Sequence, residues 1–316
     1  WISFEKFHLN WEFSWPWLNL GNVFSERIDW IQWYEYTGVF GGSLWVLCAN
    51  FLLFNLLRKY PSFKDKRRFY IRIIPRVLLI SFPIFVSLLV KPKIDKGEEF
   101  KVLITQPKID PWEAKYGNSK SNLDYFKIFK DLTNEELSTN EYDFVFTSET
   151  YFSEGYGENV DYFGYTKLHD SLNNYLSKFN NTNLISGIQF YKLYQNQKEK
   201  PTKSANPVRD NIWVDYFNSS INMSANKSFE YNHKSKLVVG SEYMPFKSIL
   251  EPIIGTVMID LGGTIRSMGT QHESERKVFK HSLKDLKTIS IVCYETIDGE
   301  YVANYVDLGA NFISII

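Results

Sequence analysis

The segment Ile289-Ser-Ile-Val-Cys-Tyr-Glu295 decides the fold class, because a short apolar run leads directly into a cysteine and then a glutamate. A run of this length predicts a buried strand. A cysteine at the end of a strand projects its sulfur from the sheet edge, where backbone N–H groups can receive an oxyanion. An inert buried thiol is the competing interpretation of a lone cysteine, and it suits Cys48, which lies inside a long apolar run.

Other strands and one amphipathic segment surround this run. Helical spacing of apolar residues predicts a helix within 113–138. Strands are predicted at 101–105, 142–147, 184–191, 211–217, 256–260, 288–292 and 311–316. Segments rich in Asn, Ser and Lys predict loops at 192–209 and 218–236. The second loop contains three glycosylation sequons, at Asn218, Asn222 and Asn226, which we attribute to chance. Strands mixed with helical segments predict a layered α/β domain over 92–316.

Two apolar runs precede this domain. Residues 37–57 are 21 residues without a charge, a helical length of about 31 Å that can cross a membrane. A buried helix in a soluble core is the alternative. The second run, 77–90, has only 14 uncharged residues, and it reaches a spanning length by including its flanking residues, with a lysine and an arginine snorkelling. We therefore expect membrane helices at about 37–57 and 73–91.

The segment 58–72 between these helices carries seven basic residues against one acid, Asp65. The positive-inside rule places such a loop in the cytoplasm, although a solvated charge run would look the same. Residues 1–36 and 92–316 then lie outside. Six of the nine tryptophans fall in the first 36 residues, which fits an interfacial aromatic belt on the outer leaflet.

Composition sets wider limits. The 316 residues contain 36 basic and 36 acidic side chains, and this balance argues against nucleic acid as a partner. Two cysteines cannot build a disulfide framework, and no Cys/His spacing indicates a zinc site. The chain begins at Trp1 and stops inside the predicted strand 311–316, so we expect it to be the later part of a longer protein, truncated within its catalytic domain.

A nucleophilic thiol needs a base or a cation beside it. The five histidines form no recognisable motif with Cys293, which leaves carboxylates and lysines. Glu149 follows an apolar strand, and Lys234 and Lys236 precede another apolar run. A surface carboxylate and a charged loop are the ordinary interpretations of these residues, and spacing alone cannot choose among them.

Longer motifs carry more information than spacing. In chain order they are Trp15-Pro-Trp-Leu-Asn-Leu-Gly21, Tyr36-Thr-Gly38, Lys101-Val-Leu-Ile-Thr-Gln-Pro107, Asp143-Phe-Val-Phe-Thr-Ser-Glu149-Thr, Lys234-x-x-Leu-Val-x-x-x-Glu242-Tyr-x-Pro245 and Cys293-Tyr-Glu295. Together they resemble the apolipoprotein N-acyltransferases, the membrane-bound branch of the nitrilase superfamily, over nearly the whole chain. Lys234, not Lys236, keeps the family's distance to the second glutamate.

Two positions depart from the family pattern. Thr147-Ser148 stands where the family usually has Trp-Pro, and Val239-Gly240-Ser241 stands where it usually has Pro-Phe-Gly. These changes bear on the shape of the pocket more than on its chemistry. The family also has further membrane helices upstream and one after the catalytic domain.

The resemblance implies a nitrilase-like α-β-β-α sandwich attached to a transmembrane portion, and a site without cofactor or metal. Glu149 is implied as general base, Lys234 as oxyanion stabiliser and Cys293 as nucleophile. Supporting roles are implied for Glu242, Tyr294 and Glu295. For Glu242 and Glu295 this role is to position Lys234 and the substrate.

The implied activity moves an acyl chain from a phospholipid to the N-terminal amine of a diacylglyceryl-cysteine lipoprotein, through a cysteine thioester. The implied partners are that donor, that acceptor and the lipid bilayer, with the protein acting as a monomer. The implied location is the bacterial cytoplasmic membrane, crossed several times, with residues 92–316 on the periplasmic side. A membrane-tethered amidase and an inactive nitrilase-like binding module are the alternatives.

Overall fold

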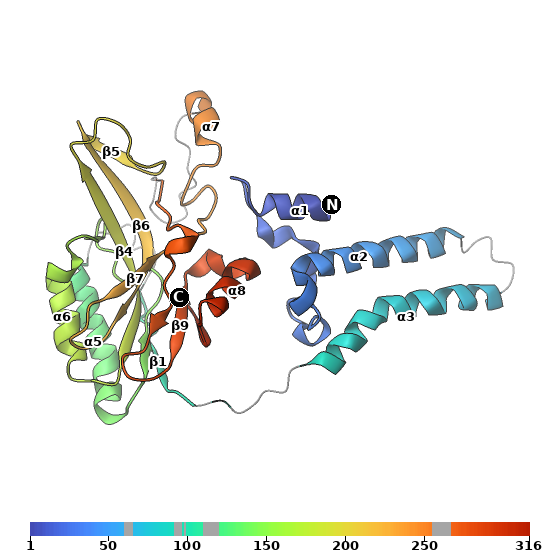
Figure 1. Cartoon of the computed structure of the whole chain (residues 1–316), viewed down its shortest axis with the longest axis horizontal. Coiled ribbons are helices and arrows are strands. Elements are labelled where there is room, and N and C mark those ends of the chain that lie inside the picture. The colour runs from blue at the N-terminus through green and yellow to red at the C-terminus, as the bar shows by residue number, and fades with distance from the viewer. Residues whose placement is uncertain (60–65, 92–96, 98, 110–119, 255–266) are drawn as a thin grey trace. The chain divides into compact units, whose positions relative to one another are not determined.

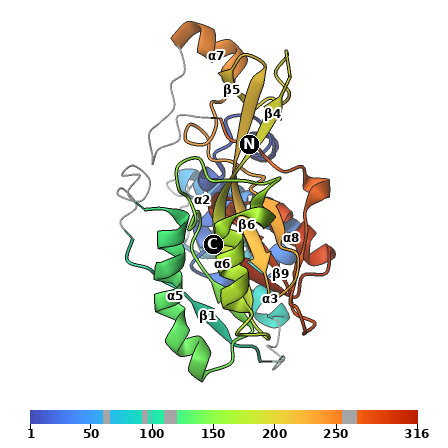
Figure 2. The same cartoon turned by 90° about the vertical axis from the view of Figure 1, so that its left-hand side faces the viewer.

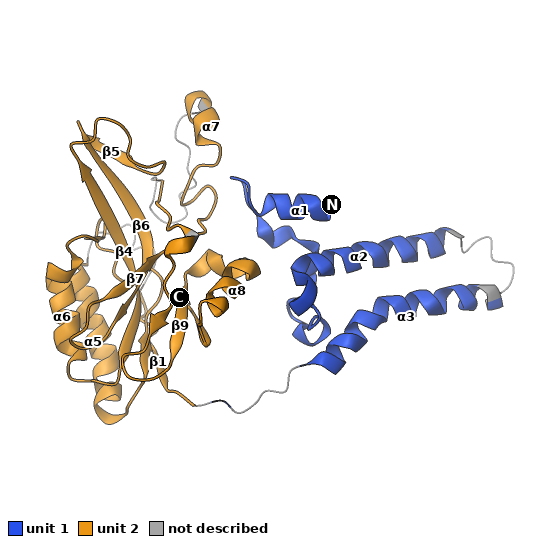
Figure 3. Cartoon of the chain, in the orientation of Figure 1, with its two compact units in different colours: residues 1–97 blue, residues 98–316 orange. Residues whose placement is uncertain are grey.

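The computed structural model describes residues 1–59, 66–91, 97, 99–109, 120–254 and 267–316, so the strand predicted at 256–260 lies outside the described residues. The chain forms two compact units, Trp1–Gly97 and Glu98–Ile316 (Figure 3). Each unit is described by itself below.

The first unit consists of helices. They are α1 (Ile2–His8), three short 3-10 turns (Pro16–Leu18, Leu20–Phe24 and Ile28–Trp30), α2 (Tyr34–Lys59) and α3 (Lys66–Val90). By length and composition, Tyr34–Arg58 and Phe69–Val90 could each cross a membrane. The prediction of a loop throughout 58–72 was wrong at both ends, because residues 58–59 belong to α2 and residues 66–72 belong to α3. Lysine and arginine are good helix formers, so a helix continues past the apolar stretch that hydropathy detects.

Polar groups and close backbone contacts hold this unit together. The Gly21 N–H donates to Ser43 Oγ at 3.0 Å, and Ser87 Oγ donates to the Trp30 carbonyl at 2.7 Å. A Cβ at Gly21 would collide with the backbone of Val39 on α2, so only glycine allows the chain to pass this close. The tryptophan-rich segment is therefore packed against α2 and α3. Cys48 is exposed on α2, which contradicts its interpretation as a core thiol.

The second unit contains two sheets (Figures 1 and 2). The larger has the order β1 (Val102–Ile104), β2 (Phe144–Phe146), β4 (Asn183–Gln195), β6 (Ile212–Met223) and β5 (Asn206–Arg209), with β3 (Glu158–Asn159) on β4 and β7 (Glu230–His233) on β6. The smaller has the order β10 (Phe312–Ile315), β9 (Lys287–Ile291) and β8 (Phe279–Lys280). The first three strands of the large sheet are parallel, and β6 runs antiparallel to β4 and to β7.

Helices cover the outer faces of these sheets. Helices α5 (Asn122–Thr139) and α6 (Lys167–Leu176) pack on the large sheet, and α8 (Gly299–Asp307) packs on the small sheet. Ser121 and Asp124 form a reciprocal cap at the start of α5. A fourth helix, α7 (Lys247–Ile254), extends from the unit in Figure 1.

Three apolar clusters separate the layers. One joins the large sheet to α5 and α6 through residues such as Phe129, Leu172 and Leu184. The second joins the small sheet to α8, and the third lies between the sheets and contains Phe144, Ile185 and Phe279. Each fully buried side chain of this size contributes roughly 1.5–3 kcal/mol. The order helix, sheet, sheet, helix confirms the predicted α-β-β-α sandwich.

The two predicted loops contain strands. Residues 192–195, 206–209, 218–223 and 230–233 all pair within the large sheet. Polar composition misled the prediction, because the Asn and Ser side chains of β6 are buried and several form hydrogen bonds inside the unit. Asn218 and Asn222 are among them, so these two sequons are not accessible for glycosylation.

Candidate active site

Glu149 lies just beyond the end of β2, where the backbone turns sharply. Thr150 has a φ of 47°, in the left-handed region. Gly187 of β4 lies directly beneath this turn, and a Cβ there would overlap the Ser148 carbonyl and the Thr150 nitrogen. The turn that presents Glu149 therefore requires glycine in the neighbouring strand.

Lys234 follows β7 and is almost completely buried, with 1% of its surface exposed. Its ammonium Nζ lies 2.8 Å from Glu242 Oε1 and 3.4 Å from Glu149 Oε1. Burial alone lowers the pKa of this lysine, but the carboxylates of Glu242 and Glu149 raise it, and the balance lies above the usual value. A permanent buried positive charge next to Glu149 is the result.

Glu242 completes this ion pair from a tight turn. Its second oxygen accepts the Val238 backbone N–H at 2.7 Å, and Gly240 between them has a φ of 80°. Both carboxylate oxygens of Glu242 are thus engaged, one by the chain and one by Lys234. This arrangement makes Glu242 an anchor for the lysine.

Cys293 begins a 3-10 turn, Cys293–Ile297, directly after β9. Its φ of 48° is rare for a residue with a side chain, and such strain is typical of a residue presented at a strand-to-helix turn. The thiol is exposed, and it interacts electrostatically with Glu149, Lys234 and Glu242. Partial desolvation and then Glu149 raise the pKa of the thiol, while Lys234 and the Tyr294 backbone act in the opposite direction. The resting side chain is therefore a thiol, and its reaction requires a proton acceptor.

Glu295 joins the lysine segment to the cysteine segment. Its Oε1 accepts the Ser235 backbone N–H at 2.6 Å, and its Oε2 accepts the Val292 backbone N–H at 2.9 Å. Tyr301 of α8 donates its hydroxyl to Oε1 at 2.6 Å. Burial raises the pKa of Glu295, and these donors act against that shift. One buried carboxyl group thus ties together the residues that follow Lys234 and precede Cys293.

The structure separates the two candidate lysines. Lys236 pairs with Asp298 at 3.2 Å, whereas Lys234 contacts both glutamates. Tyr294, the remaining residue expected to support the site, is buried next to the cysteine. The structure thus brings Glu149, Lys234 and Glu242 into direct contact and places Cys293 within their electrostatic reach; the roles implied for them stay proposals.

Sequence reasoning missed two members of this network. Tyr301 holds Glu295, and Asn218 of β6 donates its side-chain amide to Glu149 Oε1 at 2.6 Å. Asn218 was noticed only as a sequon. A polar Asn-Ser-Ser step that directly follows the predicted strand 211–217 was the available signal, since buried polar side chains need a partner.

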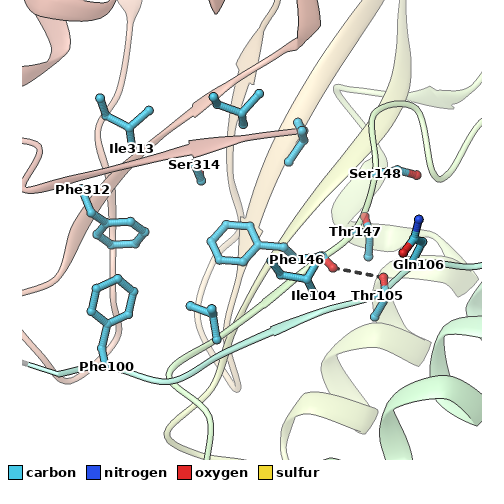
Figure 4. A pocket seen from close by; sticks show the side chains of 13 residues that line it. Phe100, Ile104, Thr105, Gln106, Phe146, Thr147, Ser148, Phe312, Ile313 and Ser314 are labelled. Atoms are coloured by element: carbon cyan, nitrogen blue, oxygen red, sulfur yellow. Dashed lines mark hydrogen bonds between the residues drawn. The ribbon is translucent and has the colours of Figure 1, made fainter. Parts of the chain in front are cut away.

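A cavity of about 500 Å³ opens between β1, β2 and β10. Figure 4 shows Phe100 and Phe312 facing each other at one end, and Thr105, Gln106 and Ser148 gathered at the other. Ser148 precedes Glu149, and the carbonyl of Ile316, also part of the lining, accepts the Cys293 N–H at 3.0 Å. The polar end of this cavity is therefore continuous with the backbone of the site.

The cluster brings together a thiol, two carboxylates and a buried ammonium. Among the residues that the structure describes, no group of three or more His, Cys, Asp or Glu side chains could hold a metal ion. A buried ammonium beside a thiol and a carboxylate can stabilise an oxyanion during attack on a carbonyl carbon.

Comparison with known proteins agrees with the motifs. The chain is 23% identical over 323 aligned residues to the apolipoprotein N-acyltransferase of Chlorobaculum tepidum, with all of this chain and 57% of that protein covered. A 106-residue segment is 31% identical to the same enzyme of Wigglesworthia glossinidia brevipalpis, covering 31% of this chain and 19% of that protein. The chain resembles the apolipoprotein N-acyltransferases. It spans only 57% of the length of the Chlorobaculum tepidum protein, and no protein-family model matches it.

Solved structures with a similar chain trace include an amidase from Nesterenkonia sp., with a TM-score of 0.40 and 12% identity over 70% of this chain and 65% of that chain. For a glutamine-dependent NAD+ synthetase from Acinetobacter baumannii, the TM-score is 0.39 and the identity is 14%, with 69% of this chain and 32% of that chain covered. For a Saccharomyces cerevisiae member of branch 10 of the nitrilase superfamily, the TM-score is 0.37 and the identity is 14%, with 62% of this chain and 59% of that chain covered.

Proposed function

We propose that this protein transfers an acyl chain from a phospholipid to the N-terminal amine of a diacylglyceryl-cysteine lipoprotein. The observation that carries the proposal is the buried Lys234, paired with Glu149 and Glu242 in electrostatic contact with Cys293, in a chain that resembles apolipoprotein N-acyltransferases over its full length. The two apolar helices of the first unit support a location in the bilayer that contains the acyl donor.

The first half of the reaction forms a thioester. Glu149 accepts the proton of the Cys293 thiol, and the sulfur attacks the ester carbonyl of the phospholipid. The oxyanion that develops lies near the Lys234 ammonium, whose raised pKa keeps it charged. The carbon–oxygen bond then breaks, and the lysophospholipid leaves with the proton that Glu149 held.

The second half uses the same groups in reverse. The free α-amine of the lipoprotein attacks the thioester, Glu149 accepts a proton from the amine, and the thiolate of Cys293 leaves and takes up that proton. The products are an amide on the lipoprotein and the free enzyme. A thioester reacts with an amine faster than an oxygen ester does, which is the advantage of the covalent intermediate.

For the topology, we propose that the basic segment between α2 and α3 faces the cytoplasm and that the unit Glu98–Ile316 faces the periplasm. The exposed aromatic and aliphatic side chains of residues 1–36 would then lie at the periplasmic surface of the cytoplasmic membrane, where lipid meets water. Their support is the positive-inside rule and the exposure of side chains such as Trp1 and Trp17.

Transfer from a labelled phospholipid tests this proposal. The purified chain in mixed micelles is incubated with deuterated phospholipid and a diacylglyceryl-cysteine peptide, and the products are separated by mass spectrometry. We expect the labelled acyl chain on the peptide amine. Release only as free fatty acid, or release of ammonia from small amides, would identify a hydrolase instead; no labelled product and no enzyme adduct would identify an inactive binding module.

A further inference from the structure

A single asparagine on β6 contacts both glutamates that pair with Lys234, and it also bonds to the backbone of that lysine. Asn218 Nδ2 donates to Glu149 Oε1 at 2.6 Å and lies 3.4 Å from Glu242 Oε1. Its backbone carbonyl accepts the Lys234 N–H at 2.8 Å. Asn218 therefore fixes both carboxylates through its side chain and the lysine segment through its backbone.

The orientation of this amide is determined by its neighbours. Asn218 is 3% exposed, and its Oδ1 has no hydrogen-bond partner among the described residues. The reversed amide would place that oxygen against two carboxylate oxygens, which repel it. Leaving Oδ1 without a partner costs about 1–3 kcal/mol. The hydrogen bonds that Nδ2 donates to the two carboxylates offset this cost, because bonds to charged groups are the stronger kind.

The consequence concerns the two oxygens of Glu149. Asn218 and Lys234 both engage Oε1, at 2.6 Å and 3.4 Å, and no described residue forms a hydrogen bond with Oε2. Gly187 fits beneath the backbone of this turn, and the contacts of Oε1 with Asn218 and Lys234 restrain the carboxylate itself. One oxygen is held and the other stays available.

We propose that Asn218 is a positioning residue of the reaction: its amide holds Glu149 by Oε1 so that Oε2 can accept the proton of the Cys293 thiol. This inference rests on the proposed role of Glu149 as the proton acceptor. Without the amide, Glu149 can turn toward Lys234 and form a tighter ion pair, in which both of its oxygens are occupied. The loss is then in the proton transfer, not in the binding of the acyl donor.

The test measures acylation of Cys293 by p-nitrophenyl butyrate, a soluble ester, as a function of pH with the full chain in detergent. Rapid quenching and mass spectrometry of the Cys293 peptide give the rate. We expect Asn218→Ala to acylate about 10²-fold more slowly than the unsubstituted protein at pH 7. The difference should shrink toward pH 10, because a growing fraction of the thiol then ionises without a base.

Asn232→Ala is the matched control. Asn232 is equally buried, on the neighbouring strand β7, and among the described residues its side chain bonds only to the Lys277 backbone. It should acylate within about threefold of the unsubstituted protein at every pH. Asn218→Leu, which fills the space without a donor, replaces Asn218→Ala if the smaller side chain prevents folding.

A rate for Asn218→Ala equal to that of the unsubstituted protein, or a defect of the same size at pH 7 and pH 10, would overturn the inference. Failure of the proposed function gives a different result, because the unsubstituted protein would then acylate Cys293 with the soluble ester but transfer nothing from phospholipid to peptide. Failure of the unsubstituted protein to acylate at all would remove the nucleophile and the inference together.

Discussion

The two units of this chain distribute apolar and polar side chains in opposite ways. In Trp1–Gly97 the large apolar residues of α2 and α3 face outward and buried serines bond to the backbone, as Ser43 and Ser87 do. In Glu98–Ile316 the large apolar residues fill three cores between the layers. The first arrangement fits a lipid solvent and the second fits water.

The exception inside the second unit is the candidate site. Lys234 and Glu295 are buried there as completely as the core phenylalanines, yet each is fully engaged by ionic or hydrogen-bonding partners. Buried charge is expensive unless it is paired, so its concentration at one sheet edge supports the function proposed for this cluster. The comparison therefore predicts different responses to the same kind of substitution in the two units.

The largest expected effect is at the buried ammonium. Lys234→Met leaves Glu149 and Glu242 facing each other without a cation, and we expect acyl transfer to fall by about 10²–10³-fold. Lys236→Met is the matched control, because Lys236 pairs with Asp298 outside the glutamate pair, and it should stay within about threefold. Rates of peptide acylation measure both variants; similar losses at the two lysines would contradict the assignment of Lys234.

The next largest effect is expected when an exposed leucine in each unit is replaced by arginine. Leu79 of α3 is 59% exposed and Leu132 of α5 is 46% exposed. If α3 crosses the bilayer, Leu79→Arg costs about 2.5–3.5 kcal/mol of insertion free energy, whereas Leu132→Arg stays within about 0.5 kcal/mol of neutral. Extraction of membranes with alkaline carbonate measures the inserted fraction, and equal retention of the two variants would remove the distinction between the units.

A smaller effect concerns pH and His233, whose side chain is partly buried. Burial, with Lys192 and Lys277 nearby, lowers the pKa of this histidine from 6.5 to about 3. Between these values the unfolded chain binds a proton that the folded chain does not, so stability is lost as pH falls below 6.5. From pH 6.5 to 4.5 this one group costs roughly 2–3 kcal/mol.

Urea unfolding of the full chain at the two pH values checks this expectation. The His233→Gln variant should lose less stability than the unsubstituted protein over the interval, by that same amount. His272→Gln, at an exposed histidine, should leave the pH dependence unchanged. A His233→Gln protein with the same pH dependence as the unsubstituted protein would show that His233 titrates normally.

The smallest effect is at the turn that presents Glu149. Gly187→Ala pushes a methyl group against the backbone of Ser148 and Thr150, and we expect acyl transfer to fall about tenfold while the sheet stays folded. Gly299→Ala, where a Cβ meets no atom within 4 Å, should leave the rate unchanged. Single-turnover acylation separates the two; an unchanged rate for Gly187→Ala would mean that the turn tolerates displacement.

Much of the architecture could be predicted from local sequence. The parallel strands β1 and β2 and the strand before Cys293 are short apolar runs, and each lies where its pattern indicates. The long strands β4 and β6 could not be bounded in this way. Their polar ends are stabilised by pairing with each other over twelve residue pairs, and no local pattern contains that information.

The candidate site divides in the same manner. Glu149, Lys234 and Cys293 were found because each belongs to a longer motif that resembles one of a known family, whereas local spacing could not choose them. Asn218 and Tyr301 could not be found by that reasoning, since their importance depends on which carboxylate the tertiary fold brings to them. Hydrogen-bond partners across sheets are a property of the fold, not of the segment.

The most direct test of the central claim is the covalent state of Cys293. The full chain is incubated with phospholipid in the absence of any acceptor, and the Cys293 peptide is analysed by mass spectrometry. We predict an acyl adduct on Cys293 that neutral hydroxylamine removes and that disappears when the lipopeptide is added. An acyl adduct that also accumulates in Cys293→Ala would contradict the account. So would a Cys293 that stays unmodified in the absence of acceptor, although the same preparation acylates the lipopeptide.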